Sequence, residues 1–191
     1  MAGKYNMKNI KKVIMILAAA AMLVSMAACG KRDAAMDQYT QTYSAMGEII
    51  ESSSFKAVCP RGWHQAYAYN IIESTEKPDK NTLIFVKGGT GVDEDKPYIK
   101  ISFHKQDSGF QTLDGSGYAD LQTVQAFIAG SNTFSGFTAL VSGQRFAYLT
   151  APAENGIFEV YLWMHVGSDI QAMITDSDVN SILSSITSTS K

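Results

Sequence analysis

The sequence is poor in the residues that most often carry chemistry, with two cysteines and three histidines in 191 residues. The histidines (His64, His104 and His165) lie on separate segments, and no His-x-x-x-His or Cys-x-x-Cys spacing occurs. Zinc sites usually take their ligands at such short spacings, so the sequence predicts no metal centre. There is no internal repeat and no second long apolar run.

Basic charge is scarce beyond the N-terminus. Four of the 16 basic residues and none of the 18 acidic ones lie before Cys29, so the remainder carries a formal charge of −6. Nucleic-acid binding relies on a basic footprint, and this acidity argues against it. It also argues against a polybasic membrane contact, so any attachment to a membrane must have another basis.

The N-terminus has the parts of a secretory signal peptide. Four lysines precede an unbroken apolar run over residues 13–24, and small residues follow it up to Cys29. A positive segment, a short apolar segment and small residues before a cleavage point are typical of such signals. The apolar run is too short for a membrane-spanning helix, which needs about 20 residues.

The Met-Ala-Ala-Cys motif that ends at Cys29 resembles the lipobox of bacterial lipoproteins. The resemblance implies cleavage after residue 28 and acyl chains such as palmitate on Cys29, which would anchor the protein to the extracytoplasmic face of the cell membrane. Gly30 at the next position favours the outer membrane if the host has one. A start at Met7 would leave the signal intact, and the alternative is an ordinary signal peptide with an incidental cysteine.

We expect residues 29–52 to form a lipidated lead-in that contains a short amphipathic helix, and residues 53–191 to form a single globular domain. Apolar side chains recur in the lead-in at helical spacing, at Met36, Tyr39, Tyr43, Met46 and Ile50. Such a stripe could pack on the chain's own domain, or it could meet a partner or a second copy.

The pattern over residues 53–191 predicts strands joined by short turns, with one central and one terminal helix. Strands are expected at 55–59, 66–72, 83–86, 98–103, 137–141, 146–149, 156–166 and 170–174, and helices at 118–129 and from Asp176 onward. Asp176 is the expected N-cap of the last helix. The fold class that follows is α+β, an antiparallel sheet flanked by helices.

Residues 55–63, Phe-Lys-Ala-Val-Cys-Pro-Arg-Gly-Trp, resemble the opening strand and Pro-x-Gly-Trp turn of PsbP-like bacterial lipoproteins. A Gly-x-x-x-Ala step from Gly143 and a closing helix that ends at Ile186 extend the resemblance over residues 53–188. It implies an α/β/α sandwich and a non-catalytic accessory role in the cell envelope, with no catalytic set to carry over. Cys59 before the proline departs from the family pattern.

Candidate catalytic and ligand motifs are incomplete. Cys59 precedes His64 by five residues, but strand alternation places its thiol toward the core, where thiols are normally inert. Ser116 lacks the glycine two places earlier that a nucleophile elbow needs. The acidic run 93–95 lacks a calcium-loop frame, and the glycines at 88–91 lack the Lys-Ser/Thr of a phosphate loop. We therefore expect no enzyme activity and no cofactor.

One strand carries a distinctive face. Alternation over residues 158–166 puts four residues on one side, with Tyr148 or Arg145 as possible neighbours: Glu159, Tyr161, Trp163 and His165. This face could line a ligand groove or bind a protein, unless a helix covers it. The sequence favours a lipid-anchored accessory protein that binds an envelope protein. The alternatives are a lipoprotein that captures a small ligand on the aromatic face and, more remotely, a hydrolase.

Overall fold

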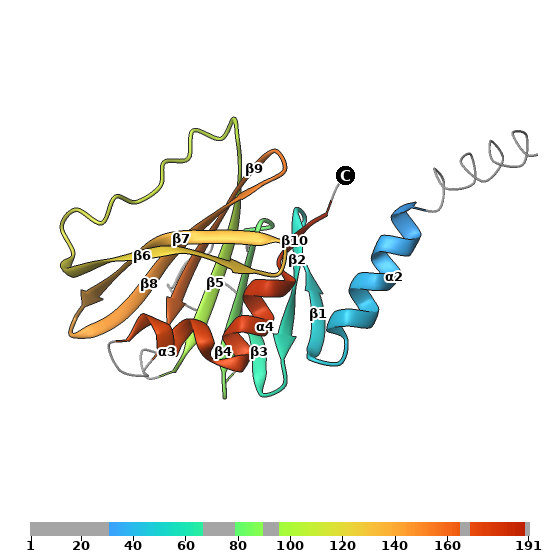
Figure 1. Ribbon diagram of the computed structural model, residues 1–191, viewed down its shortest axis with the longest axis horizontal. Coiled ribbons are helices and arrows are strands. Elements are labelled where there is room, and N and C mark those ends of the chain that lie inside the picture. The colour runs from blue at the N-terminus through green and yellow to red at the C-terminus, as the bar shows by residue number, and fades with distance from the viewer. Residues whose placement is uncertain (1–30, 67–78, 90–95, 165–168, 190–191) are drawn as a thin grey trace, which may run out of the picture. The chain divides into compact units, whose positions relative to one another are not determined.

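The computed structural model describes residues 31–66, 79–89, 96–164 and 169–189 (Figure 1). The chain divides into two compact units, Met1–Thr42 and Tyr43–Lys191. The described part of the first unit lies within helix α2 (Lys31–Tyr43). Within the described ranges, no helix is both long and apolar enough to cross a membrane.

The second unit contains two antiparallel sheets. The smaller sheet has three strands in the order β1-β2-β10, and the larger has seven in the order β3-β4-β5-β9-β8-β7-β6. The strands are β1 (Gly47–Glu51), β2 (Phe55–Pro60), β3 (Trp63–Ala66), β4 (Thr82–Lys87), β5 (Tyr98–Lys105), β6 (Ala119–Ala129), β7 (Asn132–Val141), β8 (Gln144–Ala153), β9 (Gly156–Trp163) and β10 (Thr187–Ser188). Among the described residues of this unit there are also two short helices, α3 (Ile170–Thr175) and α4 (Ser177–Ser185).

The main core lies between one face of the large sheet and a layer formed by β2, α3 and α4. Phe158 of β9 is 1% exposed and makes edge-to-face contacts with Phe55 of β2 and Phe103 of β5, each at a ring-centroid distance of 5.5 Å. Met173 of α3 and Ile182 of α4 are fully buried in the same cluster. Both helices therefore pack on this face of the sheet (Figure 1).

The Pro-Arg-Gly-Trp turn at residues 60–63 helps to hold α4 against the sheets. Gly62 has φ of +82°, a conformation that glycine adopts without steric cost. Trp63 is buried, and its Nε1 donates a hydrogen bond of 3.0 Å to Asp178 of α4. Lys87 lies 3.0 Å from the same carboxylate. The hydrogen bond from Trp63, together with Lys87, lowers the pKa of Asp178, so this carboxylate stays ionised.

The predicted α+β class, an antiparallel sheet flanked by helices as in an α/β/α sandwich, is wrong, because the described part of the second unit consists mostly of two antiparallel sheets with few short helices. The clearest error is the helix expected at 118–129, which is strand β6. Two bulges interrupt the pairing of β6 with β7, between Ala119 and Gln122 and between Val124 and Phe127. Each bulge shifts the alternation by one residue, so Val124 and Phe127 share a face at a spacing of three and imitate a helical pattern.

Two further elements differ from the sequence reading. The helix expected over the lead-in ends at Tyr43, and residues 47–51 form strand β1, in which Ile49 pairs with Val58 and Ile50 with Ala57. The strand expected at 170–174 is helix α3, whose N-cap Asp169 accepts a hydrogen bond from the backbone of Gln171. Short apolar runs suit either a helix or a strand, so periodicity alone could not decide these two cases.

Other sequence expectations are confirmed. Strands occupy 55–59, 83–86 and 98–103, and the hairpin around Ser142 and Gly143 joins β7 to β8. Asp176 caps α4 by accepting hydrogen bonds from the backbone of Asp178 and Val179. The strand expected at 66–72 begins earlier, as β3, and residues 67–72 lie outside the described ranges.

Candidate functional site: an aromatic strip on the large sheet

Three of the four side chains predicted on one strand face lie together on the sheet face opposite the main core. Tyr161 pairs across the sheet with Tyr148 and Lys100, and Trp163 pairs with Phe146 and Tyr98. Glu159 lies further along the same face of β9. The fourth predicted residue, His165, lies outside the described residues, as does the lipidation residue Cys29.

The rings on this face form a continuous series of contacts, which we call the aromatic strip and define by its five members: Tyr98, Trp163, Phe146, Tyr161 and Tyr118. Tyr98 stacks on Trp163 at 6.1 Å, and Trp163 stacks on Phe146 at 5.9 Å. Tyr161 also stacks on Phe146, and Tyr118 meets it edge-on at 5.2 Å. Phe146 is therefore the central ring of the aromatic strip, because it contacts three of the other four rings.

The strip is half-buried along the sheet and becomes exposed at one end. Tyr98, Tyr161 and Trp163 are partly buried, whereas Tyr118 is 37% exposed. Leu113 and Leu121, on either side of Tyr118 in the sequence, are 38% and 48% exposed. The side chain of Leu121 lies against Gly115, whose carbonyl accepts a hydrogen bond of 3.2 Å from the backbone N–H of Tyr118, so apolar and aromatic side chains lie close together at this end.

A stretch between β5 and β6 holds the neighbouring part of this face. The ring of Phe110 stacks on His104 at 3.6 Å, and His104 Nε2 lies 3.1 Å from the carboxylate of Glu159. Further along, the backbone N–H of Leu113 donates to the hydroxyl of Tyr148 at 3.1 Å. Glu159 is only 6% exposed and is paired with His104, so its role here is to stabilise the sheet face.

Three tyrosines of this face, Tyr98, Tyr148 and Tyr161, keep their protons at neutral pH. Burial raises the pKa of Tyr148 to about 12, and the nearby Glu159 adds to that rise. Burial is also the main cause of the raised pKa of Tyr161, followed by Glu159, and burial raises the pKa of Tyr98. These phenols remain neutral hydrogen-bond donors, so the strip combines apolar rings with polar tips.

The two described helices of the unit do not cover the strip, because their buried side chains belong to the core on the opposite face. Of the two expected neighbours, Tyr148 joins the strip face and Arg145 does not. Arg145 donates to the hydroxyl of Thr138 at 3.0 Å and forms an ion pair with Asp120. Thr138 lies opposite Ala147 in the register, on the side of the sheet that carries the main core.

Sequence reasoning missed Leu113, Tyr118, Leu121 and Phe146 as parts of this surface. Leu121 was assigned to a helix, and no local pattern indicates that Tyr118 approaches Phe146, which lies on β8. Tyr98 could have been found from the sequence, because alternate residues of a strand lie on one face and Tyr98 therefore lies with Lys100 and Ser102 on the polar side of β5. Its stacking on Trp163 depends on the strand order, which the sequence pattern does not determine.

The structure confirms that Cys59 is buried. Its side chain belongs to the main core, and burial raises the pKa of its thiol to about 11, with a smaller contribution from Glu48. A thiol with that pKa is almost wholly protonated at pH 8, and the thiolate is the nucleophilic form. Among the residues that the structure describes, no group of three or more His, Cys, Asp or Glu could hold a metal ion.

We expect Cys59 to react slowly with a thiol reagent such as DTNB in the folded chain. In a signal-free Cys29→Ser protein it is the remaining thiol, and labelling at pH 8 should be at least about 100-fold slower in buffer than in denaturant, because both burial and the raised pKa oppose it. The native rate should rise between pH 8 and pH 10 as thiolate forms. Equal rates in buffer and denaturant would contradict the buried position.

No protein-family model and no curated protein matches the sequence. Among solved structures, the chain is similar to LpqN, which is described as involved in cell envelope biogenesis of Mycobacterium tuberculosis. The two share 17% sequence identity over 75% of this chain and 90% of that chain, with a TM-score of 0.40. A likeness at this level does not indicate the function of this chain.

Proposed function

We propose that the protein is a lipid-anchored extracytoplasmic accessory protein that binds a protein partner through the exposed end of the aromatic strip and has no catalytic activity of its own. The observation that carries the proposal is the unbroken series of ring contacts from the half-buried Trp163 to the exposed Tyr118, next to exposed Leu113 and Leu121. The lipobox-like motif at Cys29 supports the anchor and the location.

Aromatic anchors of this kind suit a protein interface. Tyr and Trp are enriched at interface hot spots because they bury large areas and still offer a polar tip. Phe146 packs against the ring of Tyr118 and fixes its position, so little side-chain entropy remains to be lost when a partner binds. Exposed apolar side chains that gather in one place favour protein binding over a purely solvated surface.

Several observations support a non-catalytic role. Cys59 is buried and its pKa is raised, and Glu159 is paired with His104 beneath the ring of Phe110. A hydrolase needs a nucleophile with a base and an accessible substrate position beside them. Cys59 and Glu159 are each engaged in packing or pairing, so neither supplies an accessible nucleophile or base.

The proposal can be tested by site-specific photocrosslinking in the native cells. A photoreactive phenylalanine analogue at position 118 should give a discrete adduct with an envelope protein, whereas the same analogue at the exposed Gln171 of α3, on the opposite side of the large sheet, should not. Leu121→Ser should weaken the adduct from position 118. In a Cys29→Ser variant, both the chain and the adduct should disappear from the membrane fraction.

Two outcomes would contradict the proposal. Adducts of equal yield from positions 118 and 171 would indicate non-specific crowding at the membrane. Recovery of lipid or a small molecule alone from position 118 would instead favour a lipoprotein that captures a small ligand on the aromatic face.

A further inference from the structure

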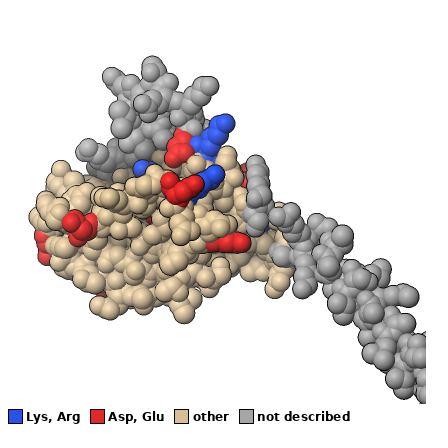
Figure 2. All heavy atoms as spheres, turned by 90° about the horizontal axis from the view of Figure 1, so that it is seen from above, with Lys and Arg blue, Asp and Glu red and all other residues tan. Residues whose placement is uncertain are grey.

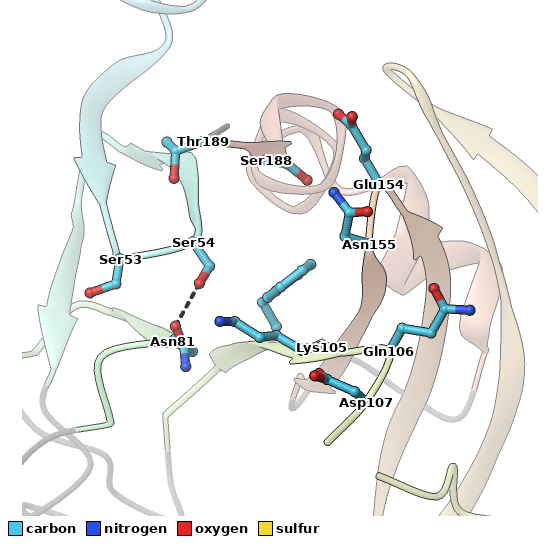
Figure 3. A pocket seen from close by; sticks show the side chains of 11 residues that line it. Ser53, Ser54, Asn81, Lys105, Gln106, Asp107, Glu154, Asn155, Ser188 and Thr189 are labelled. Atoms are coloured by element: carbon cyan, nitrogen blue, oxygen red, sulfur yellow. Dashed lines mark hydrogen bonds between the residues drawn. The ribbon is translucent and has the colours of Figure 1, made fainter. Parts of the chain in front are cut away.

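A second feature lies at the other end of β9, away from Trp163. Five chain segments meet there around an open cleft of about 850 Å³, a size typical of small-molecule sites. They are the turn before β2, the residue before β4, the end of β5, the β8–β9 turn and the C-terminal strand with the residue after it. Most of the side chains that line it are polar or charged, among them Ser54, Asn81, Lys105, Asp107, Glu154 and Asn155 (Figure 3).

The walls of the cleft are held by hydrogen bonds between these segments. Ser54 donates through its hydroxyl to Asn81 at 2.6 Å, and its carbonyl accepts from the backbone of Thr189 at 2.9 Å. The backbone carbonyl of Asn155 accepts from Gln106 at 3.1 Å, which joins the β8–β9 turn to the end of β5. The cleft is thus formed before any ligand binds, which lowers the entropic cost of binding.

Polar groups in the cleft are free to meet a ligand. Figure 3 shows Lys105 extending from β5 toward Ser54 and Asn81, with Asn155 on the other wall. Among the described residues, Lys105 forms no ion pair, so its ammonium is available to a ligand. This end of the sheets, seen from above in Figure 2, is largely uncharged, and acidic and basic side chains meet near the middle of the view.

The side chains that line the cleft indicate which chemical class of ligand it can bind. One ammonium faces two carboxylates, those of Asp107 and Glu154, so a phosphate or sulfate would meet a net negative wall. Hydroxyl and amide side chains outnumber the one aromatic residue, Phe103, so a lipid chain would lack an apolar wall. A ligand rich in hydroxyl groups fits best, because each hydroxyl both donates and accepts hydrogen bonds.

We propose that this cleft binds a neutral, hydroxyl-rich carbohydrate, with Lys105, Asn155 and Ser54 as hydrogen-bonding residues. The site is separate from the aromatic strip, since Glu154 and Asn155 form the turn that precedes β9 and Trp163 ends the strand. An anchored protein with such a cleft would bind glycan and protein at opposite ends of one sheet.

The test is an NMR titration of the ¹⁵N-labelled signal-free chain with maltotriose and with chitotriose. At least one sugar should shift the backbone amides of Ser54, Lys105 and Asn155, with a Kd of about 1 mM or tighter. Lys105→Ala should weaken binding about tenfold. Asn155→Gly should do the same and keep the left-handed backbone at φ of +64°. Lys80→Ala, at an exposed lysine outside the lining, is the matched control and should leave Kd unchanged.

The proposal is overturned if neither sugar shifts the cleft amides, or if the shifts map to the aromatic strip. It is also overturned if inorganic phosphate binds more tightly than both sugars in a manner that depends on Lys105, since that result would define an anion site. The amide spectra of the variants report whether each remains folded, so a loss of binding is distinguished from unfolding.

Discussion

Replacing Phe158 with alanine should lower the free energy of unfolding by about 3–5 kcal/mol, the usual cost of removing a fully buried aromatic side chain. Phe158 is 1% exposed and contacts Phe55 of the small sheet and Phe103 of the large sheet. Its ring therefore joins the two layers, and alanine would leave a cavity where they meet. Urea denaturation of the signal-free chain, followed by tryptophan fluorescence, measures the change.

Phe158→Leu is the matched control, because it keeps most of the buried apolar volume. It should cost about 1–1.5 kcal/mol, since leucine fills part of the space but loses both edge-to-face contacts. Equal losses for alanine and leucine would show that the ring contacts, and not the cavity, dominate. A loss below about 1 kcal/mol for alanine would contradict the central position of Phe158.

Gly130→Ala should have the second large effect, a loss of about 3 kcal/mol or more in the free energy of unfolding. Gly130 lies in the β6–β7 turn at φ of +61°, and an added Cβ would lie 1.9 Å from the backbone oxygen of Ser184 in α4. Because the clash is with backbone, relief requires the turn to move away from the helix. That movement would also strain the hydrogen bond of 2.7 Å from Asn132 to the carbonyl of Ile186.

Gly143→Ala is the control that separates the two effects expected for Gly130→Ala, the steric clash with α4 and the backbone strain of a positive φ. Gly143 also has positive φ, +79°, but an added Cβ there meets nothing within 4 Å. This variant should lose only about 1 kcal/mol, the cost of placing alanine in the left-handed region. The difference between the two variants is the cost of the contact with α4. Similar losses at both positions would mean that the turn does not press on the helix.

The spacing of apolar residues predicted the strands and helices correctly where a single strand or helix period runs through the segment. The run at 83–86 is buried on both faces as β4, and Asp176 caps α4 as expected. The prediction from sequence was wrong where pairing with a distant strand, and not the local spacing of apolar residues, determined the structure. The bulges of β6 imitate helical spacing, and the isoleucines of β1 take strand geometry because β2 provides backbone partners.

The candidate surface was predicted only along β9. Alternation correctly placed Tyr161 and Trp163 on one face, because the side-chain period of a strand is fixed. It could not show that Glu159 is paired with His104, since that contact crosses from β5 and depends on register. The polar cleft was not anticipated, because its five segments are far apart in the sequence and none has a distinctive motif.

If the chain is anchored at a membrane as proposed, the two bulges of β6 have a further consequence. β6 is an edge of the seven-stranded sheet, is exposed along most of its length and carries one charged residue, Asp120. A flat edge of that kind invites strand pairing between copies, and tethering to one surface would raise their local concentration. Because the bulges leave only the short regular stretches 122–124 and 127–129, the edge offers no long ladder to a neighbouring chain. The bulges that give β6 a helix-like sequence pattern would therefore oppose strand pairing between anchored copies.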